Sequence, residues 1–332
     1  MIIKDITGHQ KFAEAWHDRI RRGRTPHAIM LAGPAGVGKR AAAAWMARGR
    51  LGIGEQTALP QFPFEQPEHA DLQWLEPPED KQGILIEQIR ELVTNLQLTS
   101  YEGRGKVAVI EPANTMTTNA ANSLLKTLEE PPGDTLLILV ADRIGRLPAT
   151  VFSRCQRIEF APPGESEGLE WLDRLQPGAR WAEALRVAGN APIAAIPALE
   201  SLDTLATMSR ELAAVGAGKL SPVEVAGRWS KLEPAFVLDW LARQLRQGAL
   251  ALAGGRDRAP GLAIDESVLK RMDRRNLFCY LDSINRLRGQ PKGTYNVQLT
   301  LESLLIDWAD GLADAGPDRK IGGMRLMPAQ RT

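Results

Sequence analysis

The pattern of apolar and polar positions divides the chain into two halves of different character. In the first half, three short apolar-rich runs predict buried strands: Ala28–Ala32, Lys106–Ile110 and Leu136–Val140. Helical spacing follows Lys39, Gly83 and Thr117, and Thr117 or Thr118 can cap the last of these helices. Strands that alternate with helices indicate a parallel sheet covered by helices.

From residue 163 onward, strand patterns nearly vanish and helical periodicity takes over. Short helices are predicted at Glu167–Leu175, Ala179–Ala188 and Pro192–Leu199. A larger helical block follows from Thr204 to Leu312, and a loop at Gly254–Gly261 interrupts it. The predicted fold class is therefore α/β plus all-α.

The last helix of this block carries one apolar stripe. Its members are spaced by three or four positions: Leu301, Leu304, Leu305 and Trp308. We interpret the stripe as domain core, and a subunit contact is the alternative.

Charge is nearly balanced, which argues against a strongly basic nucleic-acid binder. The 332 residues include 41 Lys and Arg against 40 Asp and Glu, for a net charge of +1. A local cluster fits either a solvated helix end or a contact with phosphate backbone: Arg19, Arg21, Arg22 and Arg24. The two cysteines, Cys155 and Cys279, indicate no disulfide framework. No apolar stretch approaches the ~20 residues that cross a bilayer, and the amino terminus lacks a signal-peptide core, so we expect a cytoplasmic protein.

Residues 33–40, with the sequence GPAGVGKR, match the phosphate-binding pattern G-x-x-x-x-G-K-[ST] except at the last position. Lys39 supplies a positive charge. Three glycines let backbone N–H groups approach phosphate: Gly33, Gly36 and Gly38. The last position of the pattern holds Mg²⁺ through a hydroxyl, whereas Arg40 cannot ligate a cation. The predicted strand before the loop and the helix after it are the context that the motif requires.

A P-loop ATPase also needs acids after a neighbouring strand. One organises Mg²⁺, and a second often orients the attacking water. Here the strand ends in Glu111, but the next residue is Pro112, which has no side-chain base. Because such groups act as a unit, we predict no useful intrinsic hydrolysis. Arg40 either fills the vacated metal position and pairs with Glu111, or is a solvated residue of the first helical turn.

Two further segments resemble the bacterial clamp-loader subunits of the AAA+ family. Asn119–Pro132 is similar to their signature helix, and Leu147–Cys155 ends in their Ser-Arg-Cys segment. Both segments and the phosphate loop occur in the family's order, and His27 and Leu98–Gly103 fit as well. The resemblance covers at least residues 24–160. It implies an AAA+ domain over residues 1–162, a helical lid over 163–203 and a helical collar over 204–315, and we expect a disordered tail over 316–332.

Among these subunits the chain most resembles the delta-prime family of the DNA polymerase III holoenzyme, whose members do not hydrolyse ATP. The motor subunits tau and gamma keep the loop hydroxyl and the paired acids. Where they carry a lid arginine that senses nucleotide, this chain has Pro192, and where they carry threonines it has Ala141-Asp142. The resemblance implies a role in loading the sliding clamp onto primed DNA, with delta, tau or gamma and primer-template DNA as partners and the clamp reached indirectly.

The resemblance also implies that Arg154 is an arginine finger for the ATP of the next subunit. Arginine stays charged and offers a planar fork of donors to phosphate oxygens. Ser153 and Cys155 would support the finger, and simple packing is the alternative for both. The chain's own loop would be a degenerate nucleotide site, so we expect no ATP cofactor.

Residues 55–79 are proline-rich, and we predict an irregular surface excursion there. Family members commonly carry four cysteines in the excursion after the P-loop helix, and these bind zinc. Residues 50–67 contain no cysteine, and His69 with Asp71 does not make a structural site. We therefore expect no zinc.

Two functions of other classes compete with this interpretation. One is an active P-loop ATPase or kinase with unusual metal ligation, such as a motor subunit of a clamp-loader-like complex. The other is a stand-alone DNA-binding factor, against which the near-zero net charge argues. Binding and turnover of ATP by the lone chain distinguish the first of these from a silent subunit.

Overall fold

The structure is a computed structural model that describes residues 4–78, 81, 83–142, 147–254, 264, 273–288, 290, 293–312, 320–321 and 324–325. The chain divides into two compact units, Met1–Glu200 and Ser201–Thr332. Each unit has its own packing and is described by itself. The finer division into the domains expected from the sequence stays a prediction.

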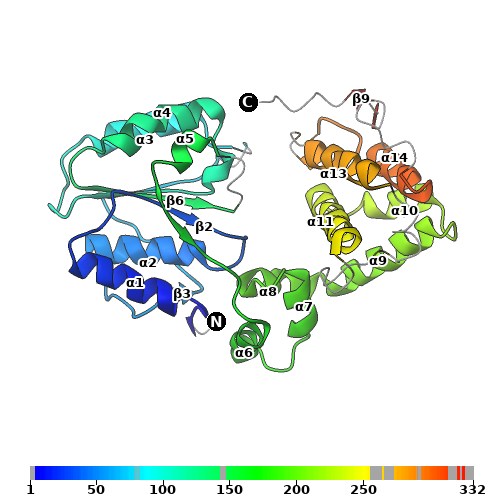
Figure 1. Ribbon diagram of the computed structural model, residues 1–332, viewed down its shortest axis with the longest axis horizontal. Coiled ribbons are helices and arrows are strands. Elements are labelled where there is room, and N and C mark those ends of the chain that lie inside the picture. Colours follow the sequence, from blue (N-terminus) through cyan, green and yellow to red (C-terminus); the bar gives the residue numbers. More distant parts are fainter. Residues whose placement is uncertain are drawn as a thin grey trace. The chain divides into compact units, whose positions relative to one another are not determined.

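A parallel sheet forms the centre of the first unit (Figure 1). Among the described residues it has five strands in the order β4 (Leu72–Leu75), β5 (Lys106–Ile110), β6 (Thr135–Ala141), β2 (Ala28–Ala32) and β7 (Gln156–Glu159). Ile29 of β2 lies opposite Ile138 on one side and Gln156 on the other. The predicted strands β2 and β5 are confirmed residue for residue, and β6 is longer than predicted by one residue at each end.

Helices cover both faces of this sheet (Figure 1). One layer contains α1 (Gln10–Arg21) and α2 (Lys39–Leu51), and the other contains α3 (Ile86–Leu96), α4 (Thr118–Glu129) and α5 (Ala149–Phe152). This arrangement confirms the predicted α/β class, because a parallel sheet needs both faces covered.

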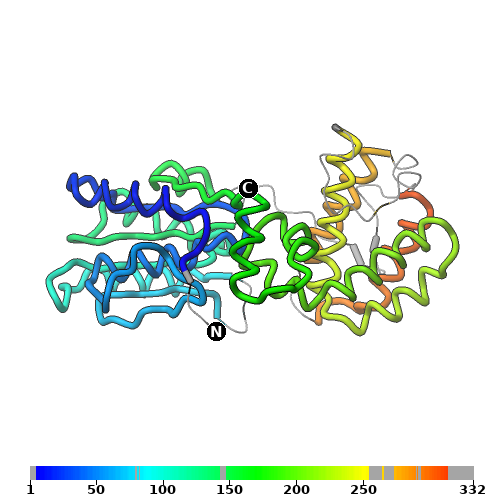
Figure 2. The backbone as a smooth tube through the Cα atoms, turned by 90° about the horizontal axis from the view of Figure 1, so that it is seen from below, coloured from blue at the N-terminus to red at the C-terminus, as the bar shows by residue number. Residues whose placement is uncertain are grey.

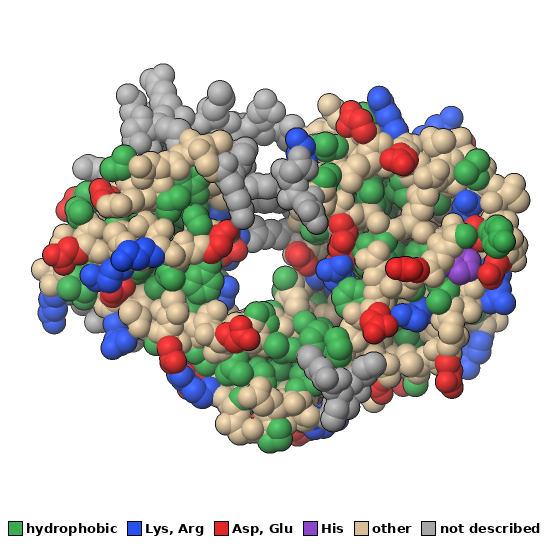
Figure 3. All heavy atoms as spheres, turned by 180° about the vertical axis from the view of Figure 1, so that it is seen from behind, with side chains coloured by type: hydrophobic (Ala, Val, Ile, Leu, Met, Phe, Trp, Pro, Cys, Tyr) green, Lys and Arg blue, Asp and Glu red, His purple; other side chains and the backbone are tan. Residues whose placement is uncertain are grey.

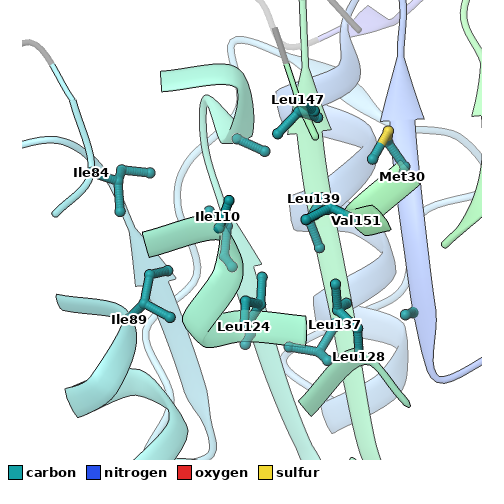
Figure 4. Close-up of a cluster of buried hydrophobic side chains, with 14 of the residues drawn as sticks. Met30, Ile84, Ile89, Ile110, Leu124, Leu128, Leu137, Leu139, Leu147 and Val151 are labelled. Atoms are coloured by element: carbon teal, nitrogen blue, oxygen red, sulfur yellow. The ribbon is translucent and has the colours of Figure 1, made fainter. Parts of the chain in front are cut away.

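Alternate residues of the central strands enter the two cores. Met30, Leu137 and Leu139 pack toward α3 and α4 (Figure 4), whereas the neighbouring residues Ile29 and Ile138 belong to the core beneath α2. All five side chains are fully buried, and burial of each stabilises the fold by roughly 1.5–3 kcal/mol.

The signature helix α4 has the predicted cap. Thr117 is its N-cap, and the Thr117 hydroxyl accepts a hydrogen bond from the Ala120 N–H at 3.2 Å. A single 3-10 turn, Ala113–Thr115, connects β5 to this helix. The helix therefore begins at a position that local sequence determines.

The excursion is more ordered than we expected, so the prediction of an irregular segment over residues 55–79 is wrong in part. Leu72–Leu75 forms β4, the edge of the main sheet, and β3 (Gln61–Phe62) pairs antiparallel with β1 (Lys4–Asp5). The sequence pattern also missed β7. Strands at the edge of a sheet are half-buried or exposed, so their apolar signal is weak.

Three helices follow β7 and form a compact cluster (Figures 1 and 2). They are α6 (Glu165–Leu175), α7 (Trp181–Val187) and α8 (Pro192–Glu200), close to the predicted bounds. The amino-terminal segment ties α6 to the rest of the unit. The Trp171 indole N–H donates to the Asp5 carbonyl at 2.7 Å, and the Thr7 hydroxyl donates to Glu167 at 2.6 Å.

The second unit is mainly helical, as predicted. Its helices are α9 (Leu202–Gly216), α10 (Pro222–Trp229), α11 (Pro234–Gly254), α13 (Arg274–Arg288) and α14 (Val297–Ala309). The predicted apolar stripe of α14 lies in the core, where Leu304, Leu305 and Trp308 are fully buried. The Trp308 indole N–H donates to the Leu212 carbonyl of α9 at 3.0 Å. The core interpretation of the stripe is confirmed.

Two predictions fall mostly on residues that the structure does not describe. The loop at Gly254–Gly261 lies outside the described residues beyond Gly254, which ends α11. In the tail, β8 (Lys320–Ile321) pairs antiparallel with β9 (Met324–Arg325), and the rest of residues 316–332 lies outside. The predicted disordered tail thus lies mostly outside the described residues.

Candidate functional site: a phosphate loop and a surface arginine

The phosphate loop connects β2 to α2 at the carboxyl end of the central strand. The Gly33 N–H donates to the Ala141 carbonyl of β6 at 3.2 Å, which fixes the start of the loop. The loop ends at Gly38, which caps α2 in the left-handed conformation. A Cβ atom at Gly38 would lie 2.8 Å from the His9 ring, so only glycine fits there. The loop geometry that the motif predicts is therefore present.

Lys39 is the first residue of α2, and its side chain is buried. Its ammonium group donates to the carbonyls of Gly33 at 2.9 Å and Pro34 at 2.7 Å. The same nitrogen lies 2.7 Å from the Asp142 carboxylate, which follows β6. The Asp142 N–H in turn donates to the Asn114 side chain at 2.8 Å. Lys39 is thus engaged by its own loop and by the next strand end.

Arg40 is paired with two carboxylates, and its side chain is also exposed to solvent, at 44%. Its guanidinium lies 2.9 Å from the Glu111 carboxylate at the end of β5 and is also paired with Glu76. The guanidinium carbon sits 4.9 Å from the centre of the Phe64 ring, which adds a cation–π contact. Of the two alternatives for Arg40, the structure contains the pairing with Glu111. Glu76 and Phe64 come from the excursion, and no sequence signal pointed to them.

Glu111 is the acid that the motif requires, but its environment is unusual. Its side chain is buried, and burial raises its pKa to about 7, although the charge of Arg40 acts in the opposite direction. The nearby carboxylates of Glu76 and Asp142 raise the pKa further. Among the described contacts of Glu111, the cationic partner is Arg40.

His9 lies beneath the loop, and sequence reasoning missed it. Its Nε2 is 2.7 Å from the Val37 carbonyl, so Nε2 carries the proton, since a carbonyl only accepts. The ring contacts Phe12 and Phe160. Burial lowers the pKa of His9 to about 4, which keeps the imidazole neutral at physiological pH. His9 therefore supports the loop as an uncharged packing group.

The loop also contacts the helical cluster that follows β7. The Ile193 N–H, in the first turn of α8, donates to the Gly36 carbonyl at 3.0 Å. A Cβ atom at Gly36 would overlap Ala194. Pro192 is the first residue of this helix. The backbone of the loop thus already has a protein partner on the side of α8.

A cavity of about 230 Å³ borders the loop. Its lining includes loop backbone, the ion-paired side chains and the excursion: Gly36, Gly38, Lys39, Arg40, Phe64, Glu111, Asp142 and Ile193. The structure therefore brings together most of the predicted nucleotide-site residues around one cavity.

Arg154 lies near the amino-terminal ends of the parallel strands, whereas the phosphate loop lies at their carboxyl-terminal ends. It precedes the first residue of β7, whereas the loop follows the last residue of the parallel strand β2. The length of β2 separates these two ends by roughly 15 Å. Arg154 is ion-paired with Glu129, the last residue of α4, and donates to the Thr150 carbonyl at 2.9 Å. The sequence did not point to Glu129 as the partner.

The two neighbours of Arg154 have structural contacts. The Ser153 hydroxyl donates to the Thr150 carbonyl at 3.1 Å and closes the end of α5. Cys155 packs against the core beside Phe152, and burial raises the pKa of its thiol to about 12. A thiol with that pKa stays protonated and unreactive. These contacts fit the packing alternative for both residues.

The described part of the chain contains neither a cluster of metal ligands nor a membrane-spanning helix. No group of three or more His, Cys, Asp or Glu residues there could hold a metal ion. No helix there is both long and apolar enough to span a bilayer. On the face shown in Figure 3, acidic and basic side chains are interspersed. The expectation that the chain binds no zinc stays a prediction.

Comparisons with known proteins give a consistent family. A family model described as "DNA polymerase III, delta subunit" matches residues 8–164. A DNA polymerase III subunit delta' of Pseudomonas aeruginosa is 31% identical over 326 residues, which cover 89% of this chain and 95% of that protein. A subunit delta' of Bacillus subtilis is 36% identical over 152 residues, 44% of this chain and 45% of that protein. A gamma subunit-related protein of Thermotoga maritima covers 90% of this chain and 99% of its own, with 20% identity and a TM-score of 0.49.

Proposed function

This chain belongs to the delta-prime family of DNA polymerase III subunits, and we propose that it helps to load the sliding clamp onto primed DNA without hydrolysing ATP itself. In this role it provides Arg154 to the ATP site of a neighbouring subunit. We propose, first, that the chain's own phosphate loop does not hydrolyse ATP (the silent loop) and, second, that Arg154, at the other end of the strands, acts on a neighbour's ATP.

The position of Arg154 is the observation that carries the proposal. It lies near the amino-terminal ends of the parallel strands, and the chain's own loop lies at their carboxyl-terminal ends. A side chain cannot bridge the roughly 15 Å between these ends, so Arg154 has no role at its own loop. Its guanidinium is partly exposed at the surface. An arginine supplied in trans to a phosphate is worth ~10³–10⁵ in turnover.

The contacts of Arg40 support the proposal that the chain's own loop does not hydrolyse ATP. A metal ligand at that position needs an oxygen, and Arg40 instead directs a cation at Glu111 and Glu76. The next residue after Glu111 is Pro112, which cannot orient a water molecule. We therefore expect neither ATP turnover nor a bound zinc or nucleotide cofactor in the lone chain.

The partners follow from the family. We propose contacts with the delta subunit and with one tau or gamma subunit, in a cytoplasmic complex around primer-template DNA. The clamp would be reached through this complex. Any DNA contact of this chain would be to backbone phosphates, and so would be weak in isolation and salt-sensitive.

The test uses complexes assembled with the other clamp-loader subunits. Arg154→Ala should reduce turnover at the one ATP site that it faces by ~10³–10⁵, so the DNA-stimulated ATPase loses that site's share. Arg154→Lys should restore little, because an ammonium group lacks the planar fork. Arg157→Ala removes a nearby exposed arginine, paired with Glu159, and serves as the matched control.

Unchanged ATPase in the Arg154→Ala complex, at equal subunit composition, would contradict the finger. The silent loop is tested separately on the purified chain. Turnover of ATP at the rate of a motor protein would favour the competing function, an active P-loop ATPase.

A further inference from the structure

The ammonium group of Lys39 has all of its donors in use. A lysine side chain offers three N–H groups, and Lys39 has three acceptors within 2.9 Å: the carbonyls of Gly33 and Pro34 and the Asp142 carboxylate. The side chain is almost completely buried, at 3% exposure, so it has no access to another partner without breaking one of these contacts.

The Asp142 carboxylate is the anionic member of this set. In a working loop the lysine contacts a phosphate oxygen, which is also anionic. Asp142 follows β6, the strand beside β2, and the Asn114 side chain accepts a hydrogen bond from its backbone N–H at 2.8 Å. The carboxylate is therefore held at the loop by the end of the neighbouring strand.

We infer that Asp142 takes the place of a phosphate group at Lys39 and is the residue that excludes polyphosphate from this loop. This inference rests on the proposed function and deepens it, because it names what keeps the loop without nucleotide. The ligand that Asp142 excludes is the polyphosphate chain of a nucleotide.

Space is not what excludes phosphate. The cavity of about 230 Å³ borders Gly36, Gly38 and Lys39, and both Asp142 and Glu111 line it. The Asp142 carboxylate repels a polyanion, and its pairing with Lys39 also removes the cationic partner that phosphate needs. Electrostatics and the lost donor therefore act in the same direction.

Arg40 has a different effect from Asp142. Its guanidinium is a cation, which attracts phosphate, and it is paired with Glu111 and Glu76. Loss of the hydroxyl at position 40 removes a ligand for Mg²⁺ and so affects hydrolysis. Asp142 thus controls the binding of polyphosphate, whereas Arg40 controls its hydrolysis.

The test measures binding of inorganic tripolyphosphate and of ATP to the full chain by isothermal titration calorimetry. The wild-type chain should show no saturable binding at millimolar ligand. Asp142→Ala frees one donor of Lys39 and removes a negative charge, so it should bind tripolyphosphate saturably, at least about 10-fold more tightly than the limit that the wild-type titration sets. ATP should follow the same order if α8 leaves room for the nucleoside.

Three further variants assign the effect. Lys39→Ala/Asp142→Ala lacks the cation and should not bind. Asp134→Ala removes a surface carboxylate that pairs with Arg50, away from the loop, and should behave as the wild type. Arg40→Thr should not bind on its own, because Asp142 still occupies Lys39.

Two results would overturn the inference: a folded Asp142→Ala chain that binds no tripolyphosphate, or an Arg40→Thr chain that binds it with Asp142 intact. Thermal unfolding shows whether Asp142→Ala is folded. If it is not, Asp142→Leu keeps a side chain of similar size that cannot accept from Lys39, and the same readings apply. The proposed finger is independent of all these outcomes, because it is measured at the neighbour's site in the assembled complex.

Discussion

Glu129 and Arg154 form an ion pair between the last residue of α4 and the second residue after α5. Both come from the segments that resemble the clamp-loader family, yet they are 25 positions apart. The pair holds the guanidinium beside the Thr150 carbonyl, at 2.9 Å. Glu129 is therefore placed to orient the proposed finger.

We predict that Glu129→Ala weakens the finger without removing it. An exposed ion pair contributes about 0.2–1 kcal/mol, so turnover at the neighbour's ATP site should fall by about 1.4- to fivefold. The measurement is DNA-stimulated ATPase of the assembled complex, with Arg154→Ala setting the full loss. Glu130→Ala changes the adjacent exposed carboxylate and is the matched control. Faster turnover than wild type would mean that Glu129 restrains the arginine instead.

Glu111 predicts an unusual pH dependence of stability. Its pKa is raised from 4.5 to about 7 in the folded chain, so between these values the folded state binds more protons than the unfolded state. The free energy of unfolding then falls as pH rises through this window, by at most about 1.4 kcal/mol per pH unit from this group. Glu111→Gln should remove this contribution. Urea unfolding of both proteins at several pH values between 5 and 8 measures the difference, and parallel curves would contradict the assignment.

His9 predicts the opposite slope. Its pKa is lowered from 6.5 to about 4, so the unfolded state binds the extra proton in this range and stability is lost as pH falls. His9→Gln, which stays neutral and keeps an N–H donor for the Val37 carbonyl, should reduce this acid sensitivity. The exposed residue His17, changed to Gln, is the control. Thermal unfolding between pH 4 and 7 is the measurement, and an unchanged acid limb in His9→Gln would contradict the prediction.

Substitution of Gly36 measures how much the contact between the loop and α8 contributes to the free energy of unfolding. It has a φ of +82°, and an added Cβ atom would overlap Ala194. Gly36→Ala should destabilise the first unit by about 2–4 kcal/mol, the sum of the backbone cost and the overlap. Gly189→Ala has a similar φ of +65° with no atom within 4 Å of its added Cβ, so it isolates the backbone cost of about 1–2 kcal/mol. Equal losses in chemical unfolding of the two variants would mean that the contact with α8 contributes nothing.

The sequence by itself determined the elements whose signals are local. The strands β2 and β5 are central and buried on both faces, so they appear as continuous apolar runs. The cap of α4 at Thr117 and the glycine loop before Lys39 depend on residues within a few positions of one another. The same holds for the departures from the motif at Arg40 and Pro112, which are visible without a structure.

Only the tertiary structure decided which side chains meet. The edge strands β4 and β7 were missed because an edge strand has one neighbour and little buried surface, so pairing specifies it more than its own pattern does. The partners of the charged residues, Asp142 for Lys39, Glu76 for Arg40 and Glu129 for Arg154, come from segments far along the chain. An ion pair depends on distance in space, and the parallel sheet sets that distance by bringing separate strand ends to one edge.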